Sequence, residues 1–193
     1  MPVMRGKGSS RSRIDVGLHF AVTQVFLALG SNLDDPLKNL AMAASRIDQL
    51  LSEATFGGLY RTAPMYFEDQ PSFVNGSAMG WTDLGPLRLL AELKRIEIEI
   101  GRQDSLRNGP RAIDIDLIGY GALKYSFRVH NQTTLEIPHP RLAERRFVLA
   151  PLADIAPAYA PPGFATVSEL LAQTNDQEED VVRLTDAVLP IRR

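Results

Sequence analysis

The chain has 193 residues, which is enough for one globular domain with a hydrophobic core. Apolar residues make up 45% of the sequence and charged residues 23%, the mixture of an ordinary globular protein rather than of a disordered or membrane-spanning one. The formal net charge of −2 lacks the basic excess of a nucleic-acid-binding surface, so we expect no nucleic-acid partner, and an anion site would need a local cluster of arginines.

Cysteine is absent, which excludes disulfides, zinc–thiolate sites and thiol nucleophiles and is compatible with the cytoplasm, where we expect the protein. No apolar run approaches the ~20 residues that span a bilayer, so we expect no membrane partner. Residues 1–23 are basic and rich in Ser and Gly, and we interpret them as a disordered extension. An over-long start or an organellar transit peptide are the alternatives. Residues 24–193 are expected to form a single domain.

The first predicted elements are a strand and a helix. Residues 25–29 form a short apolar run that ends in Gly-Ser-Asn, which indicates a strand buried on both faces. Asp35 and Pro36 supply a cap and a proline at the first helical position. The apolar stripe predicted for this helix consists of Leu37, Leu40, Ala41, Ala44, Ile47 and Leu51.

The next extended stretch is interrupted by two glycines at 57–58 and closes near Pro64, after which the chain has loop character as far as Pro71. Residues 73–82 are predicted to be a strand broken at Asn75-Gly76. A second helix is predicted to begin at Pro86 and to end at Gly101. Its apolar stripe is Leu89, Leu93, Ile96 and Ile100.

The remaining chain begins with a basic loop, residues 102–111, followed by a strand at 113–120 and a candidate strand at 135–137. A short helical or irregular segment around residue 147, a weak helix at 167–172 and an acidic tail complete the pattern. The order strand–helix–strand–strand–helix–strand predicts an α+β fold, a ferredoxin-like βαββαβ sandwich with additional C-terminal elements.

The strongest chemical signal is the Asp114-Ile-Asp116 pair. Alternate residues of a strand project from the same face, so the two carboxylates should lie together and repel unless a cation sits between them. Mg²⁺ suits that position, because it accepts one or two carboxylates and completes its shell with water and phosphate oxygens. Arg102, Arg107 and Arg111 precede the pair, so the segment is typical of a polyphosphate clamp, although a solvated strand face would show the same alternation.

Other candidates are weaker when taken alone. Lys94 and Glu97 are three residues apart on the second helix and are either a surface pair or nucleotide contacts. His139 stands between two prolines and is either an unremarkable loop histidine or a donor aimed at a phosphate. Phe73 and Asn75 could stack on and hydrogen-bond a heterocycle, or simply belong to a strand.

Taken together, these segments resemble the 6-hydroxymethyl-7,8-dihydropterin pyrophosphokinases. The matching motifs occur in the family's order over roughly residues 24–157, and the segment around Asp114 is the specific one. They are Ala28-Leu-Gly30-Ser-Asn32-Leu, Tyr60-Arg-Thr62-Ala-Pro64, Asp69-Gln-Pro71-Ser-Phe73-Val-Asn75, Arg95-Ile-Glu97, Gly101-Arg102, Gly109-Pro-Arg111-Ala-Ile-Asp114-Ile-Asp116 and Pro138-His139.

The resemblance implies transfer of a diphosphate from ATP to the hydroxymethyl group of the pterin, with release of AMP, in folate biosynthesis. It implies two Mg²⁺ ions on Asp114 and Asp116, and catalysis by these residues with Arg102 and Arg111. The implied ATP-binding residues are Lys94, Glu97, Arg107, Arg111, His139 and Arg145. The implied pterin-binding residues are Thr62, Pro64, Met65, Phe73, Asn75 and Phe147. We expect a monomer, although the sequence leaves an oligomer open.

Several positions depart from the family pattern. Asn108 stands where a tryptophan is common, Lys94 replaces a glutamine, and Pro140 follows the histidine in place of tyrosine. The loop after Arg102 is one residue shorter, and Gln103 or Asp104 replaces a basic residue. These departures bear on loop closure and pterin affinity, and they leave open a degenerate relative that binds pterin or nucleotide without turnover.

Overall fold

The computed structural model describes residues 21–64, 69–102, 109–130, 132–184 and 189. In chain order the elements are β1 (Thr23–Ser31), α1 (Pro36–Leu50), β2 (Ser52–Phe56), β3 (Leu59–Thr62), β4 (Phe73–Thr82), α2 (Pro86–Ile100), β5 (Asp114–Tyr120), β6 (Tyr125–Val129), β7 (Gln132–Ile137), η1 (Leu142–Glu144), α3 (Arg146–Ala153), α4 (Val167–Ala172), η2 (Asn175–Gln177) and β8 (Val181–Leu184). The predicted mixture of helices and strands is confirmed.

Six of the strands form one antiparallel sheet in the order β5-β1-β4-β3-β8, with β2 also paired to β4. The hairpin β6-β7 is a separate two-stranded sheet. β5 is an edge strand and β1 is the interior strand next to it, so residues of β1 have one neighbour on β5 and another on β4. This arrangement lets β1 form the floor of a site whose walls come from both neighbouring strands.

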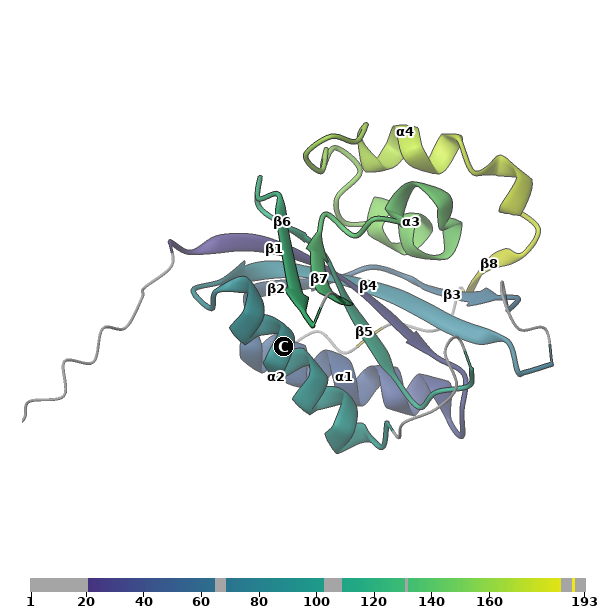
Figure 1. Cartoon of the computed structure of the whole chain (residues 1–193). Helices are drawn as coiled ribbons and strands as arrows, with labels where there is room; N and C mark the ends of the chain where they lie inside the picture. Colours follow the sequence, from purple (N-terminus) through teal and green to yellow (C-terminus); the bar gives the residue numbers. More distant parts are fainter. Residues whose placement is uncertain (1–20, 65–68, 103–108, 131, 185–188, 190–193) are drawn as a thin grey trace, which may run out of the picture.

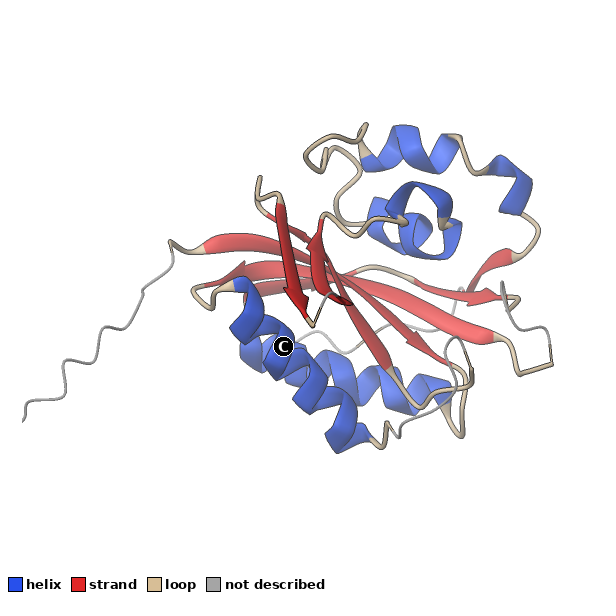
Figure 2. Cartoon of the chain, viewed as in Figure 1, coloured by secondary structure: helices blue, strands red, loops and turns tan. Residues whose placement is uncertain are grey.

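Helices cover both faces of the sheet. Figures 1 and 2 show α1 and α2 on one face and α3 and α4 on the other. β1 supplies both cores, because Val25, Leu27 and Leu29 pack with α1 and α2, whereas Phe26 and Ala28 pack with α3 and α4. The prediction of a strand buried on both faces is therefore confirmed.

The helix ends follow from local chemistry. Asp35 caps α1, since its Oδ1 accepts a hydrogen bond from the backbone N–H of Lys38 at 3.1 Å, and Pro36 occupies the first turn. α2 ends at Gly101, whose φ of +116° lies in the left-handed region that favours glycine. Leu37, predicted in the buried stripe of α1, is instead 45% exposed, because the buried face of the helix is formed by Asn39, Leu40, Ala43, Ala44 and Ile47, and Leu37 lies beside that face.

Three strand assignments differ from the sequence prediction. β4 runs unbroken through Asn75-Gly76, because both residues stay in register with β1. β6 was not predicted, and neither was β8, which lies in the segment interpreted as an acidic tail. β8 is recognisable only by its pairing with β3, since it has four residues, too few to show an alternating pattern. Within the described ranges, none of the helices has the length and apolar composition needed to cross a bilayer.

Candidate functional site

The main cavity lies on the α3 side of the sheet, over β1, β4 and β5, and has a volume of about 710 Å³ including its open mouth. Residues from β1, β3, β4, β5, α3 and the adjoining loops meet there. It is lined by Ala28, Leu29, Gly30, Thr62, Ala63, Gln70, Phe73, Asn75, Arg111, Asp114, Asp116, Arg145, Phe147 and Val148.

Two small residues of β1 form the floor. Gly30 is paired with Asp114 on one side and with Asn75 on the other, and Ala28 is paired in the same way with Asp116 and Ser77. A Cβ on Gly30 would lie 2.7 Å from Asn75 Oδ1, so glycine is required for the Asn75 side chain to keep its place. The register of β1 thus sets the two aspartates on one side of the floor and the asparagine on the other.

We call the asparagine side the uncharged end, consisting of Gly30, Thr62, Phe73, Asn75 and Phe147. Asn75 is buried, and its Nδ2 donates a 2.7 Å hydrogen bond to Thr62 Oγ1. This bond fixes the amide while its oxygen stays on the Gly30 side. The arrangement has the aromatic surfaces and amide groups that suit a flat polar heterocycle.

The opposite side is the charged end, where Arg111, Asp114, Asp116 and Arg145 line the cavity. We include in it the ion-paired neighbours behind that lining, Lys94, Glu97 and Arg102. Asp114 accepts hydrogen bonds from Arg102 Nη1 and, at 2.6 Å, from Arg111 Nη1. Burial on its own would raise the pKa of Asp114, but Lys94, Arg111 and Arg102 outweigh it and lower the pKa below its ordinary value. Asp114 is therefore a carboxylate at neutral pH.

Asp116 has a different environment. Its Oδ2 lies 3.9 Å from Arg145 Nη1, which is longer than a hydrogen bond. About a third of its side chain (36%) is exposed, but the exposed part faces the cavity, and burial together with the charge of Asp114 raises its pKa. Arg145 is nearly buried, and its guanidinium lies 5.5 Å from the centre of the Phe147 ring, so it joins the two ends of the cavity.

The two carboxylates fit Mg²⁺. The described residues contain no group of three or more His, Asp or Glu side chains arranged to hold a metal on their own. Mg²⁺ does not need one, because it is ordinarily bound by one or two carboxylates together with substrate phosphates and water. Asp116, whose raised pKa reflects burial and the like charge of Asp114, is the side chain that a divalent cation would stabilise most.

Lys94 and Glu97 do not line the cavity but cover the open edge of β5. Glu97 is buried, its Oε1 accepts the backbone N–H of Ile115 at 2.6 Å, and Lys94 Nζ lies 2.7 Å from the same oxygen and 3.5 Å from the Ile115 carbonyl. The outward backbone groups of an edge strand are thereby satisfied. Burial raises the pKa of Glu97 more than Lys94 lowers it, and Arg102 Nη1 lies 2.7 Å from its other oxygen.

His139 lies behind the charged end. Its backbone N–H donates to the Ile118 carbonyl, and its Nδ1 accepts the backbone N–H of Arg141 at 3.3 Å. Burial, with the nearby cations Arg145 and Arg141, lowers the pKa of His139 to about 4, so the ring is neutral at pH 7. His139 is not among the residues lining the cavity.

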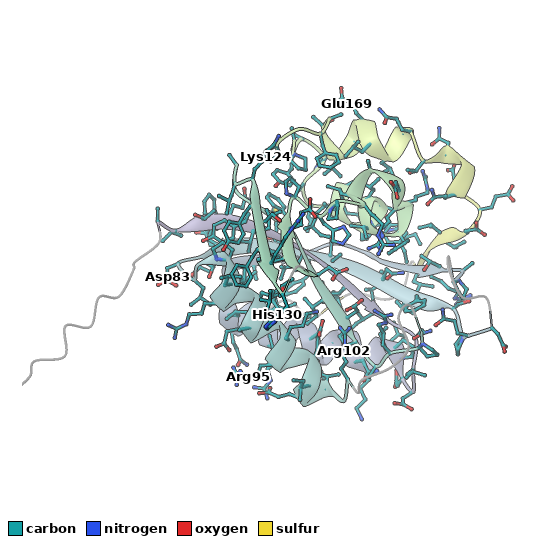
Figure 3. The ribbon with its side chains drawn as sticks, in the orientation of Figure 1. Asp83, Arg95, Arg102, Lys124, His130 and Glu169 are labelled. Atoms are coloured by element: carbon teal, nitrogen blue, oxygen red, sulfur yellow. The ribbon has the colours of Figure 1, made fainter. Side chains whose placement is uncertain are left out.

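The cavity brings together eight of the residues singled out in the sequence, namely Thr62, Phe73, Asn75, Phe147, Arg111, Asp114, Asp116 and Arg145. Pro64 lines a smaller neighbouring cavity of about 320 Å³. Arg102 reaches Asp114 from the end of α2, where Figure 3 labels it beside β5. Met65 and Arg107 lie outside the described residues, as do Gln103, Asp104 and Asn108, so their expected roles stay predictions.

Asn32 was not assigned a role from the sequence, although it belongs to a motif that was recognised. It is 3% exposed and connects two loops. Its Nδ2 donates to Gln70 Oε1 and to the Pro71 carbonyl, both at 3.1 Å, while its Oδ1 accepts the backbone N–H of Arg111 at 2.8 Å. Asn32 therefore fixes the Arg111 loop of the charged end against the loop that borders Phe73. The sequence analysis also assigned no role to Gly30 and Gln70, although both lie in motifs that match the family.

Comparison with known proteins identifies the family of the chain. The sequence profile of the 7,8-dihydro-6-hydroxymethylpterin-pyrophosphokinase (HPPK) family matches residues 26–157, more than half of the chain. The chain belongs to the HPPK family. The family resemblance deduced from the motifs is confirmed, and both ends of the cavity lie within the matched range.

Curated relatives agree with this membership. The 2-amino-4-hydroxy-6-hydroxymethyldihydropteridine pyrophosphokinase of Haemophilus influenzae is 37% identical over 155 residues, covering 79% of this chain and 94% of the relative. The folic acid synthesis protein FOL1 of Dictyostelium discoideum is 42% identical over 138 residues, covering 72% of this chain and 20% of the relative. The chain therefore spans about a fifth of the length of this longer protein.

Solved structures support the fold. A crystal structure of wild-type Plasmodium falciparum HPPK-DHPS with pterin and p-hydroxybenzoate has a TM-score of 0.70 at 16% sequence identity. The match covers 87% of this chain and 46% of the Plasmodium chain. At this identity the likeness carries the fold alone.

Proposed function

We propose that this HPPK-family chain transfers a diphosphate from ATP to 6-hydroxymethyl-7,8-dihydropterin and releases AMP, a step of folate biosynthesis. The observation that carries the proposal is the single cavity in which the Asp114–Asp116 pair and the Asn75–Phe147 wall share the floor of β1. Family membership over residues 26–157 supports the same reaction. The proposal concerns this chain alone and not any further activity of a longer protein.

In the proposed reaction the pterin hydroxyl oxygen attacks the β-phosphorus of ATP, the bond from that phosphorus to the oxygen of the α-phosphate breaks, and AMP leaves. Asp114 and Asp116 would hold Mg²⁺, two ions by family resemblance, which would neutralise phosphate charge and polarise the transferred group. In the described part of the charged end, four cationic side chains face three carboxylates, so that end attracts an anion.

Arg102 and Arg111 are the proposed catalytic arginines. Both guanidiniums are held by Asp114, so donors for the developing phosphate charge are in position before the substrate arrives. Arg145 would contact the phosphates, and Lys94, Glu97, Arg107 and His139 complete the proposed ATP-binding set. Because Lys94 and Glu97 also satisfy the edge of β5, their contribution includes the placing of the aspartate strand.

The uncharged end is the proposed pterin pocket. Asn75 would hydrogen-bond the ring and Phe73 and Phe147 would pack on its faces, with Thr62, Pro64 and Met65 completing the pocket. The Asn75–Thr62 hydrogen bond supports this assignment, since it fixes the amide in advance and lowers the entropic cost of binding. Most of the rate would come from positioning two substrates and from electrostatic stabilisation.

We also propose that the fold is ferredoxin-like, with β2 and β3 sharing the place of one strand. The order β5-β1-β4-β3, with α1 and α2 on one face, supports this assignment. The pairing of β8 with β3 supports a single domain over residues 24–193. A monomer in the cytoplasm remains our expectation for the assembly and location.

The test is a product assay with 6-hydroxymethyl-7,8-dihydropterin, ATP and Mg²⁺, in which AMP and ADP are separated by chromatography. We expect AMP in equal amount to the pterin diphosphate, and neither product when pterin is omitted or Mg²⁺ is chelated. ADP would indicate an ordinary kinase and would overturn the proposal. Pterin and nucleotide binding without turnover would indicate the degenerate relative instead.

A further inference from the structure

The start of α3 carries side chains that point to different parts of the molecule. Arg145 and Phe147 line the main cavity, and Phe147 also lines the smaller one. Arg146, between them, lines neither and packs away from the cavity against the C-terminal segment, residues 167–184. All of that segment lies beyond the range matched by the family profile.

Arg146 binds the end of α4. Its Nη1 donates to the carbonyl oxygens of Leu171 at 3.1 Å and Thr174 at 3.3 Å, and its Nη2 lies 3.8 Å from Glu178 Oε1. The side chain is only 12% exposed. A guanidinium with two carbonyls at a helix C-terminus is in the favourable position relative to the helix dipole and satisfies groups that the helix leaves unpaired.

Gln177 holds the same place from the other side. α3 has no capping side chain at Arg145, and the N–H of its first residue, Arg146, donates instead to Gln177 Oε1 at 3.2 Å. Gln177 Nε2 in turn donates to the Glu144 carbonyl at 3.1 Å. Gln177, which is distant in sequence, therefore caps α3 and hydrogen-bonds the backbone on both sides of Arg145.

We propose that Arg146 and Gln177 are positioning residues, which hold the start of α3 so that Arg145 and Phe147 keep their places at the cavity. This inference rests on the proposed function, because it holds that these two residues maintain the affinity of the proposed pterin pocket for pterin. Gln177 also lines the smaller cavity with Thr62 and Phe147, so the C-terminal segment closes the side of the uncharged end.

The test compares Arg146→Lys, Gln177→Ala and Gln177→Glu with wild-type protein. Binding of 6-hydroxymethyl-7,8-dihydropterin is measured by calorimetry with Mg²⁺ and α,β-methylene-ATP, whose α–β link cannot be cleaved, at a temperature where every variant is folded. We expect the dissociation constant for pterin and its KM to rise about tenfold in Arg146→Lys and Gln177→Ala, the scale of losing a helix cap or a charged hydrogen bond. Gln177→Glu keeps the acceptor for the Arg146 N–H but loses the donor to the Glu144 carbonyl, so it should recover only part of the affinity.

The matched control is Glu169→Ala. Glu169 forms the capping box at the opposite end of α4 with Thr166, and Figure 3 shows it at the outer edge of the molecule, far from Arg102. Its loss should lower the thermal midpoint without changing pterin affinity. Folded Arg146→Lys and Gln177→Ala with wild-type affinity and KM would overturn the inference, as would an equal loss in Glu169→Ala. Wild-type protein that binds pterin but yields no AMP would defeat the proposed function and leave the affinity comparison valid.

Discussion

The two ends of the cavity share one floor but are held together by different forces. At the charged end, Asp114 is fixed by Arg102 and Arg111 through short ion pairs, and its pKa is lowered by the surrounding cations. At the uncharged end, Asn75 is fixed by one hydrogen bond to Thr62 and by the absence of a side chain on Gly30. Ion pairs therefore position the side chains of the charged end, whereas a hydrogen bond and close packing position those of the uncharged end.

This difference predicts a division of labour. Substitutions at the charged end should reduce the rate of chemistry with little effect on pterin binding, because the charges there are proposed to act on phosphate. Substitutions at the uncharged end should weaken pterin binding and leave turnover at saturation nearly unchanged. Substitutions at either end test that division.

Asp116→Ala should lower turnover at least about 10³-fold, because it removes a carboxylate proposed to hold Mg²⁺ beside the transferred phosphate. The fold should survive, since burial and Asp114 raise the pKa of Asp116 and its charge does not stabilise the folded state. AMP release and thermal unfolding measure the two effects. A rate near that of wild type would remove the carboxylate pair from the mechanism.

Arg102→Ala should lower kcat about 10²-fold and change ATP affinity less, the loss expected when one donor to developing charge is removed. Single-turnover kinetics and nucleotide titration separate the two quantities. Arg95→Ala is the matched control, because Arg95 lies on α2, shortly before Arg102, and pairs only with Glu92 and Glu99 among the contacts that the structure gives it. Equal losses of ATP affinity and kcat would mean that Arg102 serves binding rather than chemistry.

His139 should make stability depend on pH. Its pKa is lowered to about 4, so between pH 6.5 and 4 the unfolded chain binds a proton that the folded protein does not. The contribution of the neutral ring to the free energy of unfolding is complete above pH 6.5 and is lost as pH falls. At pH 5 the loss is about 2 kcal/mol. Urea unfolding of wild-type protein and His139→Asn from pH 7 to 5 measures the difference.

We expect a smaller pH dependence in the His139 variant than in wild type. His130→Asn, at the exposed turn that Figure 3 labels, is the control for the same substitution away from the charged end. Parallel profiles for wild type and His139→Asn would show that the ring is not desolvated behind the charged end.

Gly30→Ala should raise the pterin dissociation constant and KM about tenfold, because its Cβ would lie 2.7 Å from Asn75 Oδ1 and the amide would have to move. Turnover at saturating pterin should stay within about threefold of wild type if the two ends are independent. A large fall in kcat with unchanged pterin affinity would show that the floor of β1 positions the aspartates more than the amide.

Much of the local structure was predictable from the sequence. The bounds of α1 and α2 follow from the cap and proline at Asp35-Pro36, and from Pro86 and Gly101, since these signals act within one helical turn. The shared face of Asp114 and Asp116 follows from strand alternation, which also places Ile115 and Leu117 on the opposite face, where they are buried in the core with α2. β8 was not predictable, because pairing with β3 and not its own composition makes it a strand.

The sequence by itself determined most of the charged end, because all of its parts except Arg145 lie in one stretch from Lys94 to Asp116, where a cluster of complementary charges is visible at short range. Only the tertiary structure decided the uncharged end and its supports. Gly30 meets Asn75 through strand register, Asn32 connects two loops, and Gln177 caps a helix that begins 31 residues earlier. Such contacts depend on how distant segments are brought together, and that information resides in packing rather than in any local pattern of residues.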